Sequence, residues 1–429
     1  MKFVFLILIF FFKTPDALEY KQLETRKGIK FWFVEESSIP IISVSFSFRG
    51  GSSLEPPNKH GLMNLMSSLM DEGTSKYNAS EFKNMVKNNG VKLNFSTQKD
   101  QLTGSFQVIS TQKQKGFELF YEALNHPRFD KDDINKIKNQ IVASIKIDQS
   151  NISTLASDKF NENFFLEHNF SKNVKGSKQS LQNITRDDLL RVHKKILQKR
   201  NLVIGVSGKI SEREIKKLID FVFGETGDDP KIKGPNPFSV LMKGTKVHKM
   251  QTPQTSVVFG HPGVSRKDEV FFALRIANYV LGGGGFQSRL YKNIREKKGL
   301  VYSVYSYLLS YENDGVIVGG FQTRNKSVNE TINRVRNEWN KIQKNGISKQ
   351  ELEDAKAYFN GSFIRNFTST ISIANLLQIV QYYDLGEDYF RIRSKIINNL
   401  SLKEVNSIIA EFFKTDQLFF MIVGEPGKK

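Results

Sequence analysis

A glycine run followed by an arginine and a tyrosine is the stretch of this sequence whose residue types are best suited to catalysis or substrate binding. Gly282–Gly285 leads into a stretch in which Arg295 and Tyr302 stand seven residues apart, with Gly299 between them. Gly299 predicts the end of a helix whose last turn holds Arg295, and Tyr302 then falls on the following strand. A guanidinium and a phenol both donate hydrogen bonds. Converging on one peptide carbonyl, they could stabilise a developing oxyanion, for which one donor is typically worth ~3–4 kcal/mol.

A purely structural interpretation of these residues stays open. Arg295 could complete the helix C-terminus electrostatically, and Tyr302 could pack in a sheet. The glycine run could be a plain helix-breaking turn.

Metal chemistry has few candidate residues in this chain. There is no cysteine, which excludes thiolate-bound zinc, iron–sulfur clusters and a thiol nucleophile, and the six histidines include no i, i+4 pair. The helical pattern from Gly61 to Gly73 carries Asn64, Ser67 and Ser68. Amide and hydroxyl groups are poor zinc ligands, and a serine cannot act as a general base near neutral pH. His60, just before this helix, is interpreted as a surface or capping residue, so we expect no metal on this chain.

The first of two informative stretches, Gly61–Thr74, resembles the zinc-binding helix of the insulinase/pitrilysin family of peptidases, which includes the mitochondrial processing peptidase. In that family H-x-x-E-H lies between a glycine and a terminal Gly-Thr. The flanking residues match here, whereas Asn64, Ser67 and Ser68 occupy the His, Glu and His positions. The family's third zinc ligand is a glutamate on a later helix, and no glutamate occurs from Ala123 to Asn161.

The second stretch is similar to the C-terminal signature of the same family. Gly282–Tyr291 contains a glycine-rich turn and Ser-Arg-Leu, and Ile294–Ser303 matches Arg-Glu-Lys-x-Gly-Leu-x-Tyr. The Arg/Tyr pair of the family falls on Arg295 and Tyr302. In the non-catalytic subunit of the processing peptidase a longer glycine-rich loop is linked to substrate handling, which makes Gly283, Gly284 and Gly285 candidate substrate-binding residues.

The resemblance implies a non-catalytic, zinc-less subunit of a two-chain zinc metallopeptidase. A homologous partner would supply H-x-x-E-H and the zinc, and this chain would supply Arg295 and Tyr302 to a composite site in a heterodimer. Substrates would be peptides enclosed between the two chains and bound in extended form on a sheet edge. The alternating strand Ile41–Phe48 is the edge that we expect to receive them. The alternative function is a decayed peptidase that binds peptides or scaffolds an assembly.

An internal repeat predicts the elements that must position these residues. Two similar patterns, each a helix followed by a strand, begin at Asn183 and Asn399 and end at Gly208 and Gly424, which are both 216 residues apart. We predict an α+β fold of two homologous halves, each a mixed, mostly antiparallel sheet with helices packed on one face. The expected organisation is a signal peptide at 1–17, an N-terminal half at 18–225, a linker at 226–245 and a C-terminal half at 246–429.

The N-terminus and the charge bear on the compartment. Lys2, ten apolar residues and a short polar stretch ending at Ala17 are typical of a secretory signal peptide, although an uncleaved anchor stays an alternative. We expect an exported chain, periplasmic in a bacterium, without stable membrane insertion after cleavage. The formal net charge is +19. No interleaved aromatic and basic motif accompanies this charge, so we expect no nucleic-acid partner. The positive charge could instead attract an acidic partner chain, anionic peptides or a membrane surface.

Overall fold

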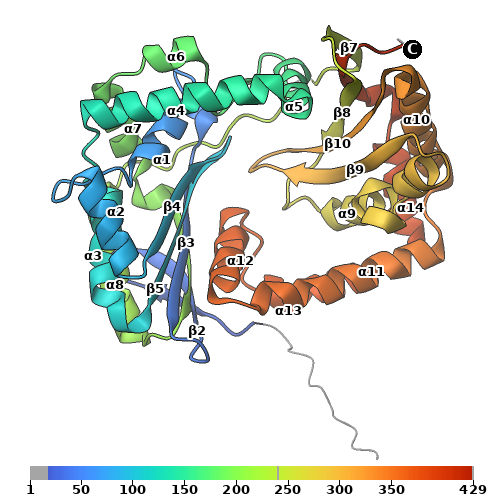
Figure 1. Cartoon of the computed structure of the whole chain (residues 1–429). Helices are drawn as coiled ribbons and strands as arrows, with labels where there is room; N and C mark the ends of the chain where they lie inside the picture. The colour runs from blue at the N-terminus through green and yellow to red at the C-terminus, as the bar shows by residue number, and fades with distance from the viewer. Residues whose placement is uncertain (1–17, 239–240, 428–429) are drawn as a thin grey trace, which may run out of the picture.

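Two β-sheets form the centres of the two halves of the chain (Figure 1). The computed structural model describes residues 18–238 and 241–427, and the predicted signal peptide at 1–17 lies outside them. The strands are β1 (Lys21–Glu24), β2 (Lys30–Glu35), β3 (Ile41–Arg49), β4 (Lys92–Thr97), β5 (Gln101–Ile109), β6 (Leu202–Gly208), β7 (Gly244–Lys249), β8 (Gln254–Gly263), β9 (Val301–Ser310), β10 (Gly315–Arg324) and β11 (Phe419–Gly424). The first sheet has the order β1-β2-β6-β3-β5-β4 and the second has the order β7-β11-β8-β10-β9. Apart from β1, the second sheet repeats the first strand for strand.

Both sheets are mixed, because each contains a single parallel pair among antiparallel ones. The parallel pairs are β2 with β6 and β7 with β11, which occupy corresponding positions in the two sheets. The predicted fold class and the two homologous halves are therefore confirmed. Between the last helix of the first half and β7, leaving aside residues 239 and 240, the chain forms no helix or strand.

The helices repeat as well. Those of the first half are α1 (Leu62–Leu69), α2 (Ala79–Asn88), α3 (Lys113–Asn125), α4 (Lys131–Ser150), α5 (Ile152–Phe164), α6 (Lys178–Gln182), α7 (Arg186–Ile196) and α8 (Glu212–Phe223). Those of the second half are α9 (Phe271–Asn278), α10 (Val328–Asn345), α11 (Lys349–Phe363), α12 (Thr370–Tyr382), α13 (Tyr389–Asn399) and α14 (Leu402–Phe412). A capping box is present at the start of α11, where Ser348 and Glu351 each accept a hydrogen bond from the other's backbone N–H. No helix in the described residues is long and apolar enough to cross a membrane.

The two halves exchange one helix each across their sheets. Helix α5 of the first half packs on β8 and β11, and α12 of the second half packs on β3 and β6 (Figure 1). Glycines on the strands allow this close approach. A Cβ on Gly205 would lie 2.1 Å from the carbonyl oxygen of Ala374, and a Cβ on Gly260 would lie 2.3 Å from the ring of Phe160. Each sheet therefore has its own helices on one face and a helix of the other half on the opposite face.

The position of β3 corrects one prediction. The strand Ile41–Phe48 was expected at a sheet edge, but β3 pairs with both β5 and β6 and lies inside the sheet. Its serine face is also covered, because Ser43 Oγ lies 2.8 Å from Thr370 Oγ1 and Gln378 of α12 donates to Ser47 Oγ at 2.6 Å. A peptide cannot add to this strand. The described edges of the second sheet are β7 and β9.

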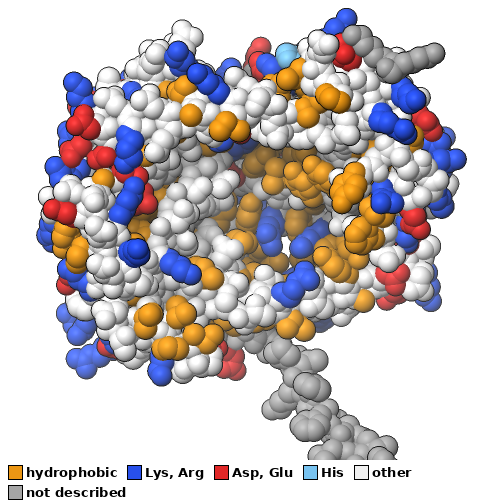
Figure 2. Space-filling model, viewed as in Figure 1, with side chains coloured by type: hydrophobic (Ala, Val, Ile, Leu, Met, Phe, Trp, Pro, Cys, Tyr) orange, Lys and Arg blue, Asp and Glu red, His pale blue; other side chains and the backbone are white. Residues whose placement is uncertain are grey.

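The halves enclose a hollow. Figure 2 shows it in the middle of the molecule, with apolar and basic side chains gathered within it. At one place the halves are joined by buried polar contacts, in which Arg49 of β3 forms an ion pair with Glu312 in the β9–β10 turn. Asp100, in the β4–β5 turn, accepts a hydrogen bond from the Glu312 N–H at 3.1 Å. This junction fixes β9 and β10 relative to the first half.

Candidate functional site

Arg295 lies in a wide helical turn that ends as the sequence predicts. The turn η7 (Tyr291–Glu296) is π-helical, and Ile294 anchors it in the core of the second half. The chain leaves it at Gly299, whose φ is +60° and whose N–H donates to the Arg295 carbonyl at 2.9 Å. The guanidinium is half-buried and lies 5.8 Å from the centre of the Tyr291 ring. No hydrogen bond in the described part of the chain occupies its N–H groups.

Tyr302 lies at a bulge on the edge strand β9. Val301 pairs with Thr323 and Val304 pairs with Phe321, so Tyr302 and Ser303 together face the single residue Gln322. The bulge turns Tyr302 outward, and 88% of the residue is exposed. Within the described residues the phenol has no hydrogen-bond partner, and none joins it to Arg295. The Arg295 guanidinium and the Tyr302 hydroxyl thus lie on either side of the Gly299 turn in the chain. Both are free to donate a hydrogen bond to a bound molecule.

The glycine run packs against β9. A Cβ on Gly282 would lie 2.3 Å from Ser306 Oγ, and one on Gly284 would lie 2.8 Å from the Tyr279 carbonyl oxygen. Gly285 has a φ of +57° with open space around it. These close contacts account for glycine at positions 282 and 284, where a side chain would not fit. Beyond the run, Phe286 is 72% exposed.

The Ser-Arg-Leu segment holds this loop to α11. Arg289 donates to both carboxylate oxygens of Glu351, at 2.7 and 2.6 Å, and to the Gly346 carbonyl at 3.1 Å. Leu290 is fully buried and Ser288 Oγ donates to the Gly285 carbonyl. A bidentate guanidinium–carboxylate pair fixes orientation as well as distance. Arg289 therefore positions the loop, whereas Arg295 keeps its donors free.

The first half keeps the shape of the zinc helix but ties up its polar side chains. Ser67 and Ser68 both donate to the Asn64 carbonyl, at 3.0 and 2.8 Å, and Thr97 Oγ1 lies 3.1 Å from Ser67 Oγ. Gly61 is needed by the backbone, because its φ is +94° and a Cβ would lie 2.6 Å from the Lys175 carbonyl oxygen. The flanks of the motif thus persist for reasons of packing, independently of zinc chemistry.

Histidines and carboxylates do not replace the missing ligands. No group of three or more His, Cys, Asp or Glu side chains that could hold a metal ion occurs in residues 18–238 and 241–427. His261 is buried, accepts a hydrogen bond from the Lys414 N–H and contacts the Pro262 carbonyl, and burial lowers its pKa to about 4. His60 lies 3.8 Å from Glu55, whose carboxylate accepts hydrogen bonds from the Gly61 and Met63 N–H groups at the start of α1. These residues serve the fold.

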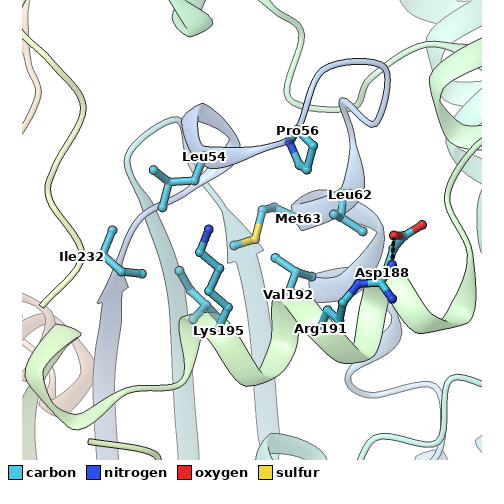
Figure 3. Close-up of a pocket in the computed structure, with 10 residues that line it drawn as sticks. Leu54, Pro56, Leu62, Met63, Asp188, Arg191, Val192, Lys195 and Ile232 are labelled. Atoms are coloured by element: carbon cyan, nitrogen blue, oxygen red, sulfur yellow. Dashed lines mark hydrogen bonds and ion pairs between the residues drawn. The ribbon is translucent and has the colours of Figure 1, made fainter. Parts of the chain in front are cut away.

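A cavity of about 130 Å³ lies on the other side of α1, between this helix and α7 (Figure 3). Apolar side chains, among them Leu54, Met63 and Val192, form most of its wall. Asp188 at its rim is held in ion pairs with Lys59 and Arg191. Asn64, Ser67 and Ser68 do not line it, so the cavity is separate from the degenerate motif.

Sequence reasoning missed the polar junction between the halves. Arg49, Asp100 and Glu312 are far apart in the chain and belong to no motif. It also missed three arginines of the second half: Arg266 and Arg275, which are half-buried, and Arg393, which is buried. For Arg275 a signal existed, because it stands in the otherwise apolar helix α9 (FFALRIAN).

Comparisons with known proteins identify a family with the same two-domain organisation. Residues 33–178 match the domain described as insulinase (peptidase family M16), and residues 183–359 match the peptidase M16 inactive domain. The non-peptidase homolog YmxG of Helicobacter pylori is 26% identical over 100% of this chain and 99% of its own length. The zinc protease PqqE of the same organism is 25% identical over 89% of this chain and 87% of its own length.

A solved structure agrees as well. The peptidase M16 inactive domain from Pseudomonas fluorescens superposes with a TM-score of 0.90 at 25% identity, covering 96% of this chain and all of that one. Two domain matches of one family together span most of the chain, and one relative aligns over its full length. The chain belongs to the insulinase family of peptidases, family M16, as a member in which Asn64, Ser67 and Ser68 stand where the zinc motif would be.

Proposed function

We propose that this protein is the non-catalytic subunit of a two-chain zinc metallopeptidase. It supplies Arg295 and Tyr302 to a composite site, and a homologous partner with H-x-x-E-H supplies zinc, the attacking water and the general base. The single observation that carries the proposal is that one chain has both features: free hydrogen-bond donors on β9 and η7, and a helix α1 that lacks the zinc ligands of the family.

The chemistry follows from the donors. A peptide carbonyl that is attacked by water gains negative charge on its oxygen. A guanidinium and a phenol held in place can donate to that oxygen more strongly as the charge develops. Both groups act in this step as hydrogen-bond donors, and neither has to transfer a proton.

The names of two relatives support a complex of one zinc-less and one zinc-bearing chain. Helicobacter pylori contains one relative named a non-peptidase homolog and another named a zinc protease. Under our proposal, a chain of the first kind takes part in hydrolysis only together with a chain of the second kind. We propose such a heterodimer here, exported through the signal peptide predicted at 1–17 and acting on peptides.

The test compares the isolated chain, an isolated zinc-bearing homologue from the same genome, and their mixture. The zinc content of each and hydrolysis of a quenched fluorescent peptide library are measured. We expect the isolated chain to be inactive and the mixture to exceed the sum of its parts. A fully active, zinc-loaded isolated chain would overturn the proposal.

Matched variants locate the effect. Tyr302→Phe and Tyr305→Phe each remove one phenolic oxygen from the same strand, and only the first is proposed to face the reacting carbonyl. We expect Tyr302→Phe to lower kcat about 100-fold, the usual cost of one oxyanion donor, and Tyr305→Phe to leave it within about twofold. Arg295→Ala is compared with Lys292→Ala on the same turn in the same way.

The alternative is a peptide-binding or scaffolding protein without any part in hydrolysis. The exposed tyrosines Tyr302, Tyr305 and Tyr307 on β9 favour it, because aromatic side chains at a sheet edge suit peptide capture. In that case the mixture shows no gain in hydrolysis, while a labelled peptide still binds the chain.

A further inference from the structure

Three arginines in the second half have no acidic partner among the described residues. Arg266 lies between β8 and α9, Arg275 lies on α9, and Arg393 lies on α13. Among the residues that the structure describes, none of the three forms an ion pair with an aspartate or a glutamate. By contrast, Arg289, Arg334 and Arg391 in the same half are each paired with a carboxylate.

Aromatic rings bring the three guanidiniums together. Arg266 and Arg275 lie over the same ring, that of Phe271, at 5.9 and 6.0 Å from its centre. Arg275 lies 4.6 Å from the centre of the Phe359 ring, and Arg393 Nη2 donates to the Phe359 carbonyl at 3.0 Å. Phe271 and Phe359 thus connect a continuous row of positive charge.

Polar atoms in this row are buried without partners. Arg393 is only 2% exposed, and its Nη1 has no hydrogen bond. Tyr389 Oη, at the start of the same helix, interacts with the Arg393 guanidinium, and Arg266 Nε is buried without a hydrogen-bond partner. Within the described residues the Arg275 guanidinium donates no hydrogen bond. Arg266 and Arg275 are half-buried, so the row is open on their side.

The electrostatics of this row are unfavourable as it stands. Burial, together with repulsion from Arg266 and Arg393, lowers the pKa of Arg275 to about 10. Contacts with ring faces offset part of the desolvation cost of a guanidinium, but they provide neither an acceptor oxygen nor a full negative charge. Buried charges in proteins are normally paired, and no carboxylate among the described residues pairs with this row.

We infer that Arg266, Arg275 and Arg393, with Tyr389, form a binding site for an oxyanion. The planar guanidinium fork matches the oxygens of carboxylates and phosphates. A carboxylate of a peptide inside the hollow and free inorganic phosphate offer the same chemistry. The site exists independently of the function proposed above, because it uses neither Arg295 nor Tyr302.

The test measures thermal unfolding of the full chain at rising phosphate concentration, with sodium chloride at matched ionic strength as reference. We expect phosphate to raise the unfolding midpoint in a saturable way while chloride does not. Arg275→Met should raise the apparent Kd for phosphate about tenfold, since one charge-assisted contact is lost. Arg334→Met, which removes a partly exposed arginine of the same half that is paired with Glu330, should respond like the wild type.

A second pair of ligands separates the two sources. An N-acetylated hexapeptide with a free C-terminal carboxylate is compared with its C-terminal amide. Competition between the acid and phosphate, but not between the amide and phosphate, assigns the site to peptide carboxylates, and a response to phosphate alone assigns it to a free oxyanion.

Two results would overturn the inference. One is a wild-type chain that responds to neither phosphate nor the peptide acid. The other is an equal response in the wild type, in Arg275→Met and in Arg266→Met. Arg266→Met serves as the second variant because its half-buried side chain can be replaced with less risk to folding than Arg393.

Discussion

Arg49 at the end of β3 and Glu312 in the β9–β10 turn form an ion pair between the two halves, with side chains only 8% and 11% exposed. Arg49 Nη2 also donates to the Tyr382 carbonyl at 2.7 Å, which ties in the exchanged helix α12. Because β9 carries Tyr302, this pair orients the proposed donor strand relative to the half that contains α1.

Arg49→Met should destabilise the protein strongly. It leaves the Glu312 carboxylate buried without its counter-charge, which typically costs about 3–5 kcal/mol. The double variant Arg49→Met/Glu312→Met should recover much of this loss, since two apolar side chains replace the pair. Urea unfolding measures both. Lys21→Met, in an exposed ion pair with Glu212, is the control and should change stability by less than about 1 kcal/mol. Equal losses in the single and double variants would contradict this account.

Asp100 should make stability depend on pH. Burial, and to a smaller degree the charge of Glu312, raises the pKa of Asp100 to about 6 from an ordinary value of 3.8. The folded chain therefore binds this proton more tightly than the unfolded chain does. Its contribution to stability is complete below about pH 4 and is lost as the pH rises to about 6, by up to roughly 3 kcal/mol.

Asp100→Asn provides the matched comparison. The amide keeps an oxygen that can accept from the Glu312 N–H but does not titrate. The difference in unfolding free energy between the variant and the wild type should therefore grow from pH 4 to pH 6 and stay constant above it. A difference that is independent of pH would contradict the assignment.

Two glycine substitutions should change stability in opposite directions. Gly205→Ala places a methyl group 2.1 Å from the Ala374 carbonyl oxygen and pushes α12 away from β6, at a cost of about 1–3 kcal/mol. Gly361→Ala lies in α11 with open space around it and should stabilise the protein by about 0.5–1 kcal/mol. Thermal unfolding of both variants checks the sign of each effect.

Restoring the H-x-x-E-H motif in α1 should not restore a stable catalytic zinc site. The variant Asn64→His/Ser67→Glu/Ser68→His gains two histidines and a base, but α4 contains no glutamate to serve as the third ligand. We expect the wild type to hold far less than one zinc per chain, and the variant to lose zinc on dialysis. Zinc analysis after dialysis measures both. Stoichiometric zinc retained by the variant would show that another residue completes the site.

The internal repeat made the fold predictable from the sequence. The place of β3 inside its sheet was not predictable in this way. Offsets of 216 residues in sequence correspond to helices and strands that occupy equivalent positions in two sheets of the same order. Alternation of apolar residues and serines in β3 predicts one face on the core and one polar face. The polar face is covered by α12, which brings hydroxyl and amide partners for Ser43 and Ser47. Alternation records polarity on one side, and it cannot tell solvent from a polar helix face.

The candidate site was predictable only as far as its motif extends. The order of glycine run, Arg295 and Tyr302 follows from local turn chemistry, because Gly299 ends the helical turn and β9 begins two residues later. The bulge that exposes Tyr302 depends on the pairing of β9 with β10, which no local pattern contains. The row of arginines depends on contacts between α9, α11 and α13, and it needs the tertiary structure in the same way.

The exchange of α5 and α12 has a consequence for the history of the chain. A single ancestral half could cover the second face of its sheet only with the helix of another copy, so it would have been an obligate symmetric dimer. Joining two copies in tandem closes that swap within one polypeptide. A protease cut between Phe223 and Gly244 should therefore leave two fragments that remain clasped, because each holds a helix of the other.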